Sequence, residues 1–221
     1  MRRMKPELTI DSLCSEAAIF AETESQHREI ALFGVTDGKA VGTYLEAKFK
    51  RLLAEKFRFD LGNAASGIDL PGLLVDLKVT SVTQPQSSCP FKSARQKIYG
   101  LGYSLLVFVY EKSDDPATKT STLNIVKTVF VEDFRTADFQ TTSGIQQILN
   151  NDGNKDDVLA FFNDRNLPVD DIEASRIADE LLSSRKITIG YLTISNALQW
   201  RLQYSRVLIQ AGNVLGLRRI R

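Results

Sequence analysis

The sequence predicts an α/β fold in which a core with a β-sheet is followed by a mainly helical C-terminal region. Three segments are predicted strands, residues 73–80, 103–110 and 123–131, because their apolar residues alternate or run continuously. Before the first strand and after the third, apolar residues recur at helical spacing. The chain has 221 residues, 43% of them hydrophobic, which suits one continuous globular unit. We expect residues 1–135 to form the core and residues 136–221 a helical lobe.

Two helices are predicted ahead of the first strand. The first is capped by Asp11 and reaches about Arg28. The second follows the turn at Asp37-Gly38, and its apolar residues recur at helical spacing. These residues are Leu45, Phe49, Leu52, Leu53 and Phe57. Glycines and small polar residues predict a loop over residues 61–67.

The remaining elements are predicted from the same patterns. A polar loop over residues 81–90 and a helix over 92–101 follow the first strand. Beyond the third strand we expect helices at 134–150, 156–163 and 170–184, the last with an acidic cap. A final helix is predicted from a cap at Ser195 to about Gly212.

The composition excludes several kinds of chemistry. The chain has one histidine, His27, and two cysteines, Cys14 and Cys89. These could hardly complete a structural zinc site, which takes four such ligands. Phosphatases and nucleases built on several histidines are excluded, as is a serine triad unless His27 alone serves it. Catalysis should therefore rest on carboxylates and lysine.

The same composition bears on location. Two cysteines do not make a disulfide framework, and the longest apolar run is too short to cross a bilayer. The N-terminal residues show no secretory signal. We therefore expect a cytoplasmic protein with no membrane partner.

Charge is sorted along the chain although the net charge is only +1. Residues 77–110 hold four basic residues and no acidic ones, and residues 181–221 hold seven basic and no acidic ones. Residues 111–180 hold fifteen acidic and seven basic residues. Binding of a polyanion is one reason for such sorting. The alternative is that a basic tail merely offsets an acidic middle.

Gly67-Ile68-Asp69-Leu70-Pro71 followed by Val75-Asp76-Leu77-Lys78 is the pattern that carries chemistry. Strand alternation places Asp76 and Lys78 on one face. Two neighbouring carboxylates can hold Mg²⁺, which prefers oxygen ligands, and the carbonyl of Leu77 is a natural additional ligand. Such a metal ion polarises a phosphate and activates water, which a nearby lysine can hydrogen-bond. The alternative is a surface strand with an exposed ion pair.

This pattern resembles the active site of the PD-(D/E)XK nuclease superfamily and, within it, of type II restriction endonucleases. The resemblance covers roughly residues 42–110. It begins at Gly42-Thr43-Tyr44-Leu45-Glu46-Ala47-Lys48-Phe49, which is similar to the acidic motif on the family's first helix, and continues through 67–81 and 91–97. Ile68 stands where the family usually has proline, and only six residues separate Asp69 from Asp76.

The resemblance implies roles for particular residues. Asp69 and Asp76 would bind Mg²⁺, Lys78 would assist the attacking water, and Glu46 would add a carboxylate to the metal shell. It also implies a restriction-endonuclease-like core, a mixed β-sheet flanked by helices. Such proteins usually cut both strands of a short palindrome in double-stranded DNA as homodimers, without a nucleotide cofactor.

Two segments after the Asp-x-Lys strand are candidate DNA contacts. Gln84, Gln86, Ser87 and Ser88 suit base edges, although the alternative is a flexible polar loop. Basic and hydroxyl residues near a helix start suit phosphates, although the alternative is a solvated helix face. They are Lys92, Ser93, Arg95 and Lys97.

The predicted last helix offers a second DNA element. Its polar start resembles a recognition helix, but Leu198, Leu202 and Ile209 favour packing on the core or at a dimer interface. In that arrangement Arg201 and Arg206 remain free to touch phosphate.

Three functions are therefore weighed. A homodimeric type II restriction endonuclease is the leading hypothesis. The second is a repair or recombination nuclease of the same superfamily, such as a nickase or junction resolvase. The third is a DNA-binding regulator without catalysis, which would shift DNA in a gel but not cut it.

Overall fold

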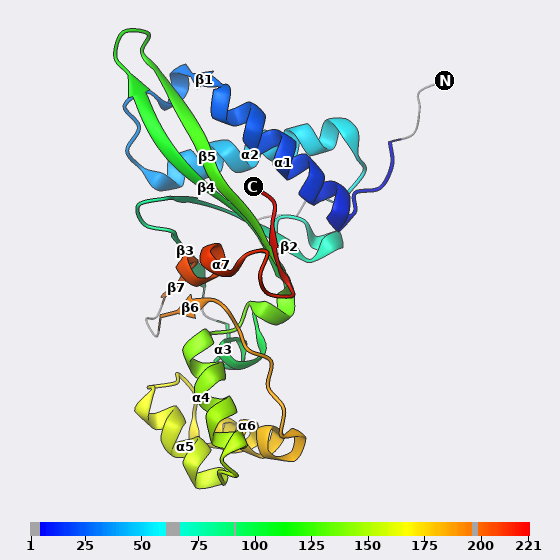
Figure 1. The fold of residues 1–221 in the computed structure, drawn as a ribbon, viewed down its shortest axis with the longest axis vertical. Helices are drawn as coiled ribbons and strands as arrows, with labels where there is room; N and C mark the ends of the chain where they lie inside the picture. The colour runs from blue at the N-terminus through cyan, green and yellow to red at the C-terminus, as the bar shows by residue number, and fades with distance from the viewer. Residues whose placement is uncertain (1–4, 61–66, 91, 196–198) are drawn as a thin grey trace. The chain divides into compact units, whose positions relative to one another are not determined.

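The computed structural model describes residues 5–60, 67–90, 92–195 and 199–221, and it has the expected α/β class. The chain forms two compact units (Figure 1). The first unit comprises Met1–Pro85, Ser104–Val131 and Gln210–Arg221, and the second comprises Gln86–Tyr103 and Glu132–Ile209. The chain crosses from the first unit to the second after Val131, close to the expected boundary at 135/136. Segment 86–103, however, belongs to the second unit and the C-terminal segment to the first.

The first unit contains a mixed β-sheet with the order β1-β5-β4-β2, in which β8 also pairs with β5. β2 runs parallel to β4, and β4 and β5 form a long antiparallel hairpin. The strands are β1 (Arg28–Glu29), β2 (Val75–Ser81), β4 (Ser104–Asp115), β5 (Thr120–Val131) and β8 (Leu217–Arg219). The predicted strands are confirmed, with β4 extending beyond its predicted end.

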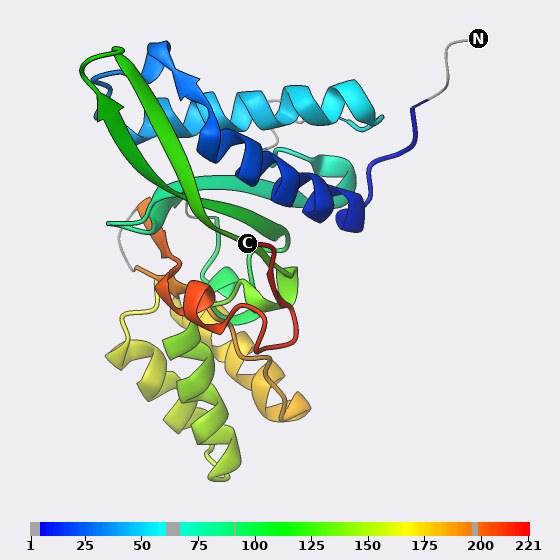
Figure 2. The ribbon, with the colours of Figure 1, turned by 45° about the horizontal axis from the view of Figure 1, so that its top comes forward.

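Helices α1 (Ile10–Gln26) and α2 (Gly38–Lys56) flank this sheet (Figure 2). The rings of Phe20, Phe49 and Phe108, from α1, α2 and β4, lie with centroids 5.0 to 5.7 Å apart in the core. Both helices were predicted, but the cap of α1 is Thr9, in a capping box with Ser12, and not Asp11. Short 3₁₀ turns occupy Ile30–Leu32 and Pro71–Leu73.

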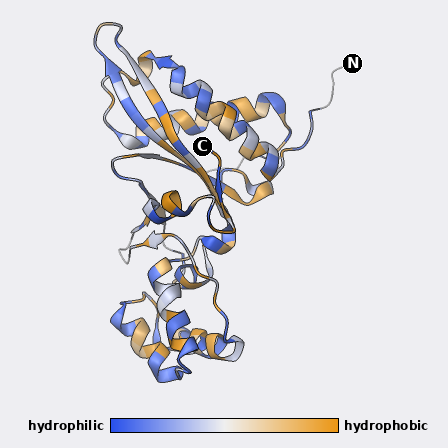
Figure 3. Cartoon of the chain, viewed as in Figure 1, coloured by the Kyte–Doolittle hydropathy of each residue, from blue (hydrophilic) through white to orange (hydrophobic). Residues whose placement is uncertain are grey.

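The second unit combines helices with a small antiparallel sheet of order β3-β7-β6. Its apolar core includes Ile145, Val158, Phe162 and Ile177. Figure 3 shows apolar and hydrophilic residues mixed along the helices of this unit, as expected of helices that pack by one face. The elements are β3 (Gln86–Pro90), α3 (Arg95–Tyr99), the 3₁₀ turn Asp133–Arg135, α4 (Phe139–Asn150), α5 (Lys155–Asp164), α6 (Asp171–Ser184), β6 (Thr193–Ile194), β7 (Gln199–Gln203) and α7 (Ser205–Gln210).

Two predictions in this unit are wrong. The polar loop 81–90 ends in strand β3, and the final helix from Ser195 to Gly212 is replaced by β7, α7 and the approach to β8. Trp200 and Leu202 are buried while Arg201 and Gln203 are exposed, a two-residue period that only a strand provides. Ile209, expected in the core, is 65% exposed.

Other predictions are confirmed or untested. Asp170 caps α6 as predicted, accepting the N–H of Glu173. Leu198 lies outside the described residues, and so do all residues of the predicted loop 61–67 except the last. In the described part of the chain, no helix is both long and apolar enough to cross a membrane.

Candidate active site

A tight hairpin brings Asp69 to strand β2. Leu70 and Val75 exchange backbone hydrogen bonds of 3.0 and 3.2 Å, and the 3₁₀ turn Pro71–Leu73 closes the loop between them. Leu74 takes the left-handed conformation (φ 52°) that lets the chain reverse. Asp69 therefore lies beside the start of β2, where its carboxylate accepts the N–H of Leu77 at 2.9 Å.

Strand β2 places Asp76 and Lys78 together. Val75 and Leu77 are buried in the first unit's core, while the Asp76 carboxylate and the Lys78 ammonium pair at 2.7 Å. Asp76 is only 4% exposed. The carboxyl groups of Asp76 and Asp69 are also hydrogen-bonded to each other. Asp69 therefore lies next to the face of β2 that carries Asp76 and Lys78, as the sequence predicted.

Helix α2 contributes Glu46 and Lys50, one turn apart on one helix face. The ammonium group of Lys50 pairs with Asp69. Glu46 is partly buried within the electrostatic reach of Asp69, Lys78 and Lys50. Lys50 was missed in the sequence, where its spacing four residues after Glu46 on a predicted helix was the available signal.

Burial and neighbouring charge set the protonation of the carboxyl groups. Burial, reinforced by the charge of Asp69, raises the pKa of Glu46 to about 7. Burial and the hydrogen bond with Asp69 raise the pKa of Asp76 to about 6 despite Lys78. Burial also acts to raise the pKa of Asp69, but hydrogen bonds from Asp76, Lys50 and the Leu77 N–H outweigh it and lower that pKa. The shared proton therefore belongs mainly to Asp76.

Lys78 keeps its positive charge in this environment. Burial favours the neutral amine, but the charges of Asp76, Glu46 and Asp69 outweigh it and raise the pKa of Lys78. Below about pH 6 the site therefore combines a carboxyl pair that shares one proton with two ammonium groups.

The oxygen groups of this site suit a hard divalent cation. Among the described residues, no group of three or more acidic, histidine or cysteine side chains is arranged around a metal position. Asp69 and Asp76 together offer carboxylate oxygens from one hairpin. Mg²⁺ is usually held by one or two carboxylates and keeps several waters. This pair of carboxylates therefore suits Mg²⁺, which does not need a closed cage of protein ligands.

The predicted base contacts occupy different environments. Gln84 is exposed ahead of β3, and Gln86 and Ser88 lie on β3 itself. Ser87 points the other way, where its hydroxyl hydrogen-bonds that of Tyr204 at 2.5 Å. Of the predicted base contacts, Gln86 and Ser88 therefore lie on one face of β3 and Ser87 on the other, while Gln84 precedes the strand.

Several predicted phosphate contacts are engaged within the second unit. Arg95 pairs with Glu173 at 2.7 Å and with Glu180. Lys97 is only 4% exposed, and burial lowers its pKa, so its predicted surface role is wrong. The guanidinium of Arg206 lies 3.6 Å from the ring centroid of Phe139. Lys92 and Arg201 are exposed, and the Ser93 hydroxyl accepts the N–H of Arg95.

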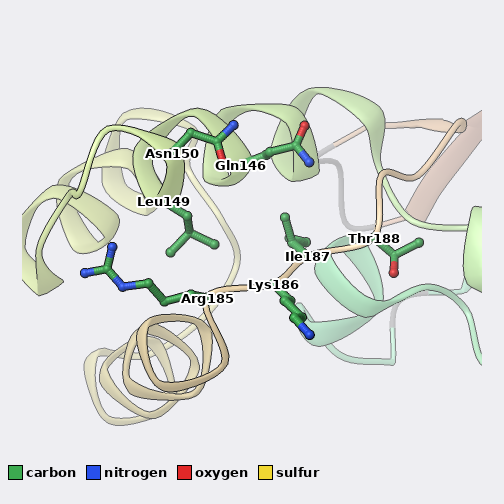
Figure 4. A pocket seen from close by; sticks show the side chains of 7 residues that line it. All are labelled: Gln146, Leu149, Asn150, Arg185, Lys186, Ile187 and Thr188. Carbon is green, nitrogen blue, oxygen red and sulfur yellow. The ribbon is translucent and has the colours of Figure 1, made fainter.

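The second unit also has an open pocket of about 380 Å³ between α4 and the segment after α6 (Figure 4). It contains none of the predicted site residues. Its lining is Gln146, Leu149, Asn150, Arg185, Lys186, Ile187 and Thr188.

Comparison with known proteins gives a match along both units. A family profile described as Type II restriction enzyme NspV matches residues 7–219. The Type II restriction enzyme NspV of Nostoc sp. (strain ATCC 29411 / PCC 7524) is 64% identical over 210 residues, which cover 95% of this chain and 95% of that protein. No solved structure matches the chain.

Proposed function

Because the chain belongs to the type II restriction enzyme NspV family, and is therefore a site-specific deoxyribonuclease, we propose that Asp69, Asp76 and Lys78 form its catalytic centre. Its substrate is double-stranded DNA. Family membership favours restriction over the repair-nuclease and non-catalytic alternatives. The observation that carries the proposed centre is the hydrogen-bonded pair of Asp69 and Asp76 beside the ammonium group of Lys78.

Type II restriction enzymes use a divalent metal ion, and we propose Mg²⁺ for this one. Asp69, Asp76 and the carbonyl of Leu77 would hold it, with Glu46 as a further carboxylate of the shell. When bound, the ion supplies positive charge at the scissile phosphate and makes water a stronger nucleophile. The carboxyl pair must lose its shared proton for both groups to act as anions.

The two lysines act on the phosphate and the water. Lys78, held in place by Asp76 at 2.7 Å, can donate hydrogen bonds to the attacking water and to a phosphate oxygen. Lys50, paired with Asp69, can supply a second cation as negative charge develops on the phosphate. Both lysines thereby hold positive charge where the transition state gains negative charge.

We propose that the enzyme is a cytoplasmic homodimer. One Asp-x-Lys centre serves one strand, so two copies related by a twofold axis would cut both strands of a palindrome. The base contacts are likewise proposed to come from the second unit, with Lys92 and Ser93 at phosphates.

The test is cleavage of unmethylated phage DNA by the purified protein, with Mg²⁺ and separately with EDTA. We expect discrete bands only with Mg²⁺. Asp69→Ala should abolish cutting while gel shifts still show DNA binding, whereas Asp164→Asn, at an exposed site in the second unit, should cut normally. Full activity of Asp69→Ala would overturn the proposed centre.

A further inference from the structure

The small sheet of the second unit has one buried face and one polar face. Cys89 of β3 and Trp200 of β7 are opposite each other and buried, as is Leu202. The alternate positions pair Ser88 with Arg201, and Gln86 with Gln203. Directly opposed residues of antiparallel strands project from the same face. Thr193 of β6 is opposite Gln203 and belongs to that face too.

We define this polar face by five residues. Ser88, Arg201 and Gln203 are exposed, and Gln86 and Thr193 are partly buried. The polar face consists of Gln86, Ser88, Thr193, Arg201 and Gln203.

Charge sets this sheet apart from its surroundings. β3 comes from the acid-free segment 77–110, and β6 and β7 come from the acid-free segment 181–221. The fold therefore pairs the two acid-free segments with each other, although they are far apart in the sequence. The three strands contain no Asp or Glu. Strands free of acidic residues suit a polyanionic partner.

The side chains on the polar face suit hydrogen bonding to bases more than bulk attraction to phosphate. Binding by charge alone relies on many Lys and Arg residues, whereas this face has one arginine, Arg201. Its amides and hydroxyls can donate and accept. Glutamine matches the major-groove edge of adenine, and arginine that of guanine.

The register of Arg201 is fixed by its neighbours. The Ser195 hydroxyl accepts the N–H of Arg201 at 2.9 Å, and the Ser195 N–H donates to the Arg201 carbonyl at 3.2 Å. On the buried side, the hydrogen bond between Ser87 and Tyr204 joins β3 to the end of β7. Precise reading of bases requires such a rigid support.

We propose that this polar face is the base-reading surface of the enzyme and enters the major groove of its target as a β-ribbon. Its two longer strands, β3 and β7, form an antiparallel pair of the kind that this groove admits, and the two-residue β6 borders β7. The proposal deepens the proposed endonuclease function and rests on it. It adds Gln203 and Thr193 to the expected contacts, removes Ser87, and gives Arg201 a base in place of a phosphate.

The test begins with the wild-type enzyme, whose site is found by sequencing the ends that it cuts. Cleavage efficiency, kcat/KM, is then measured on the cognate duplex and on duplexes that each carry one substituted base pair. Gln203→Ala and Arg201→Ala should each reduce discrimination at a particular base pair by about 10- to 100-fold, the range of one bidentate contact. Gln147→Ala, an exposed glutamine on α4, is the matched control and should leave discrimination unchanged.

The alternatives give different results. If Arg201→Ala lowers kcat/KM equally on all duplexes and leaves discrimination unchanged, Arg201 contacts phosphate. Its assignment to a base is then wrong. Unchanged discrimination in both variants, with thermal unfolding like that of wild type, overturns the whole proposal. Failure of the wild-type enzyme to cut with Mg²⁺ would instead contradict the proposed function itself.

Discussion

The carboxyl groups of Asp69 and Asp76 share a hydrogen bond across a hairpin that the Leu70 and Val75 backbone closes. Six residues lie between the two acids, and a 3₁₀ turn with a left-handed Leu74 takes up that length. The short spacing therefore brings the two carboxyl groups together.

Metal binding should depend on pH. The pKa of Asp76 is raised to about 6 and that of Glu46 to about 7, so both hold protons in mildly acidic solution. Cations compete with these protons, and the Mg²⁺ concentration for half-maximal cutting should fall as pH rises from 6 to 8. Magnesium titrations of cleavage at each pH measure this. Half-maximal concentrations that are equal at pH 6 and 8 would contradict it.

Glu46→Gln should stabilise the metal-free protein at alkaline pH. The folded pKa of Glu46 lies above its ordinary value, so the folded state binds the proton more tightly, and stability is lost as pH rises from about 4.5 to 7. The neutral amide removes this loss, which amounts to up to about 3 kcal/mol in the free energy of unfolding. Thermal unfolding in EDTA at pH 5 and pH 8 tests it: the gain over wild type should appear at pH 8. Cleavage should fall in the same variant.

Lys78→Ala should reduce kcat by at least about a hundredfold, because it removes a hydrogen-bond donor to the water and the phosphate. DNA affinity, measured in Ca²⁺ in place of Mg²⁺, should stay close to that of wild type. Lys127→Ala, an exposed lysine on β5, is the control and should cut normally. Wild-type kcat in Lys78→Ala would remove Lys78 from the centre.

Lys50→Ala should impair cutting and move its pH dependence. The ion pair with Lys50 helps to keep the pKa of Asp69 low, so its loss should raise that pKa. Single-turnover rates at subsaturating Mg²⁺ should then need higher pH than in wild type. A uniformly lower rate with an unmoved pH profile would show that Lys50 does not act through Asp69.

Arg95→Ala should affect stability more than DNA binding. Its guanidinium is shared between Glu173 and Glu180, and it joins α3 to α6. Because these groups are largely exposed, solvent screening should keep the loss in the free energy of unfolding small. The salt dependence of DNA affinity should keep its slope, and a slope that falls by about one would restore the phosphate contact expected from the sequence.

The sequence predicted the local geometry of the candidate site. Asp76 and Lys78 share a face because strands alternate, and the six residues after Asp69 permit only a tight turn. Lys50 was missed because its partner lies on another element, and a helix pattern does not show which face meets β2. The burial of Lys97 was missed for the same reason.

The small sheet was missed for a different physical reason. β3 and β7 are short and gain their stability from pairing with each other across more than a hundred residues of chain. Neither segment has a long apolar pattern of its own. Ser195 suggested a helix cap, although Trp200, Leu202 and Tyr204 already alternate as in a strand.

The chain passes between its two units four times, after residues 85, 103, 131 and 209. No single break in the gene therefore separates the segment proposed to choose the DNA sequence from the segment proposed to cut it. Recombination that exchanged the second unit as a block would have to join four boundaries at once. New sequence preferences in this family should thus arise by point substitutions on the polar face rather than by shuffling of modules.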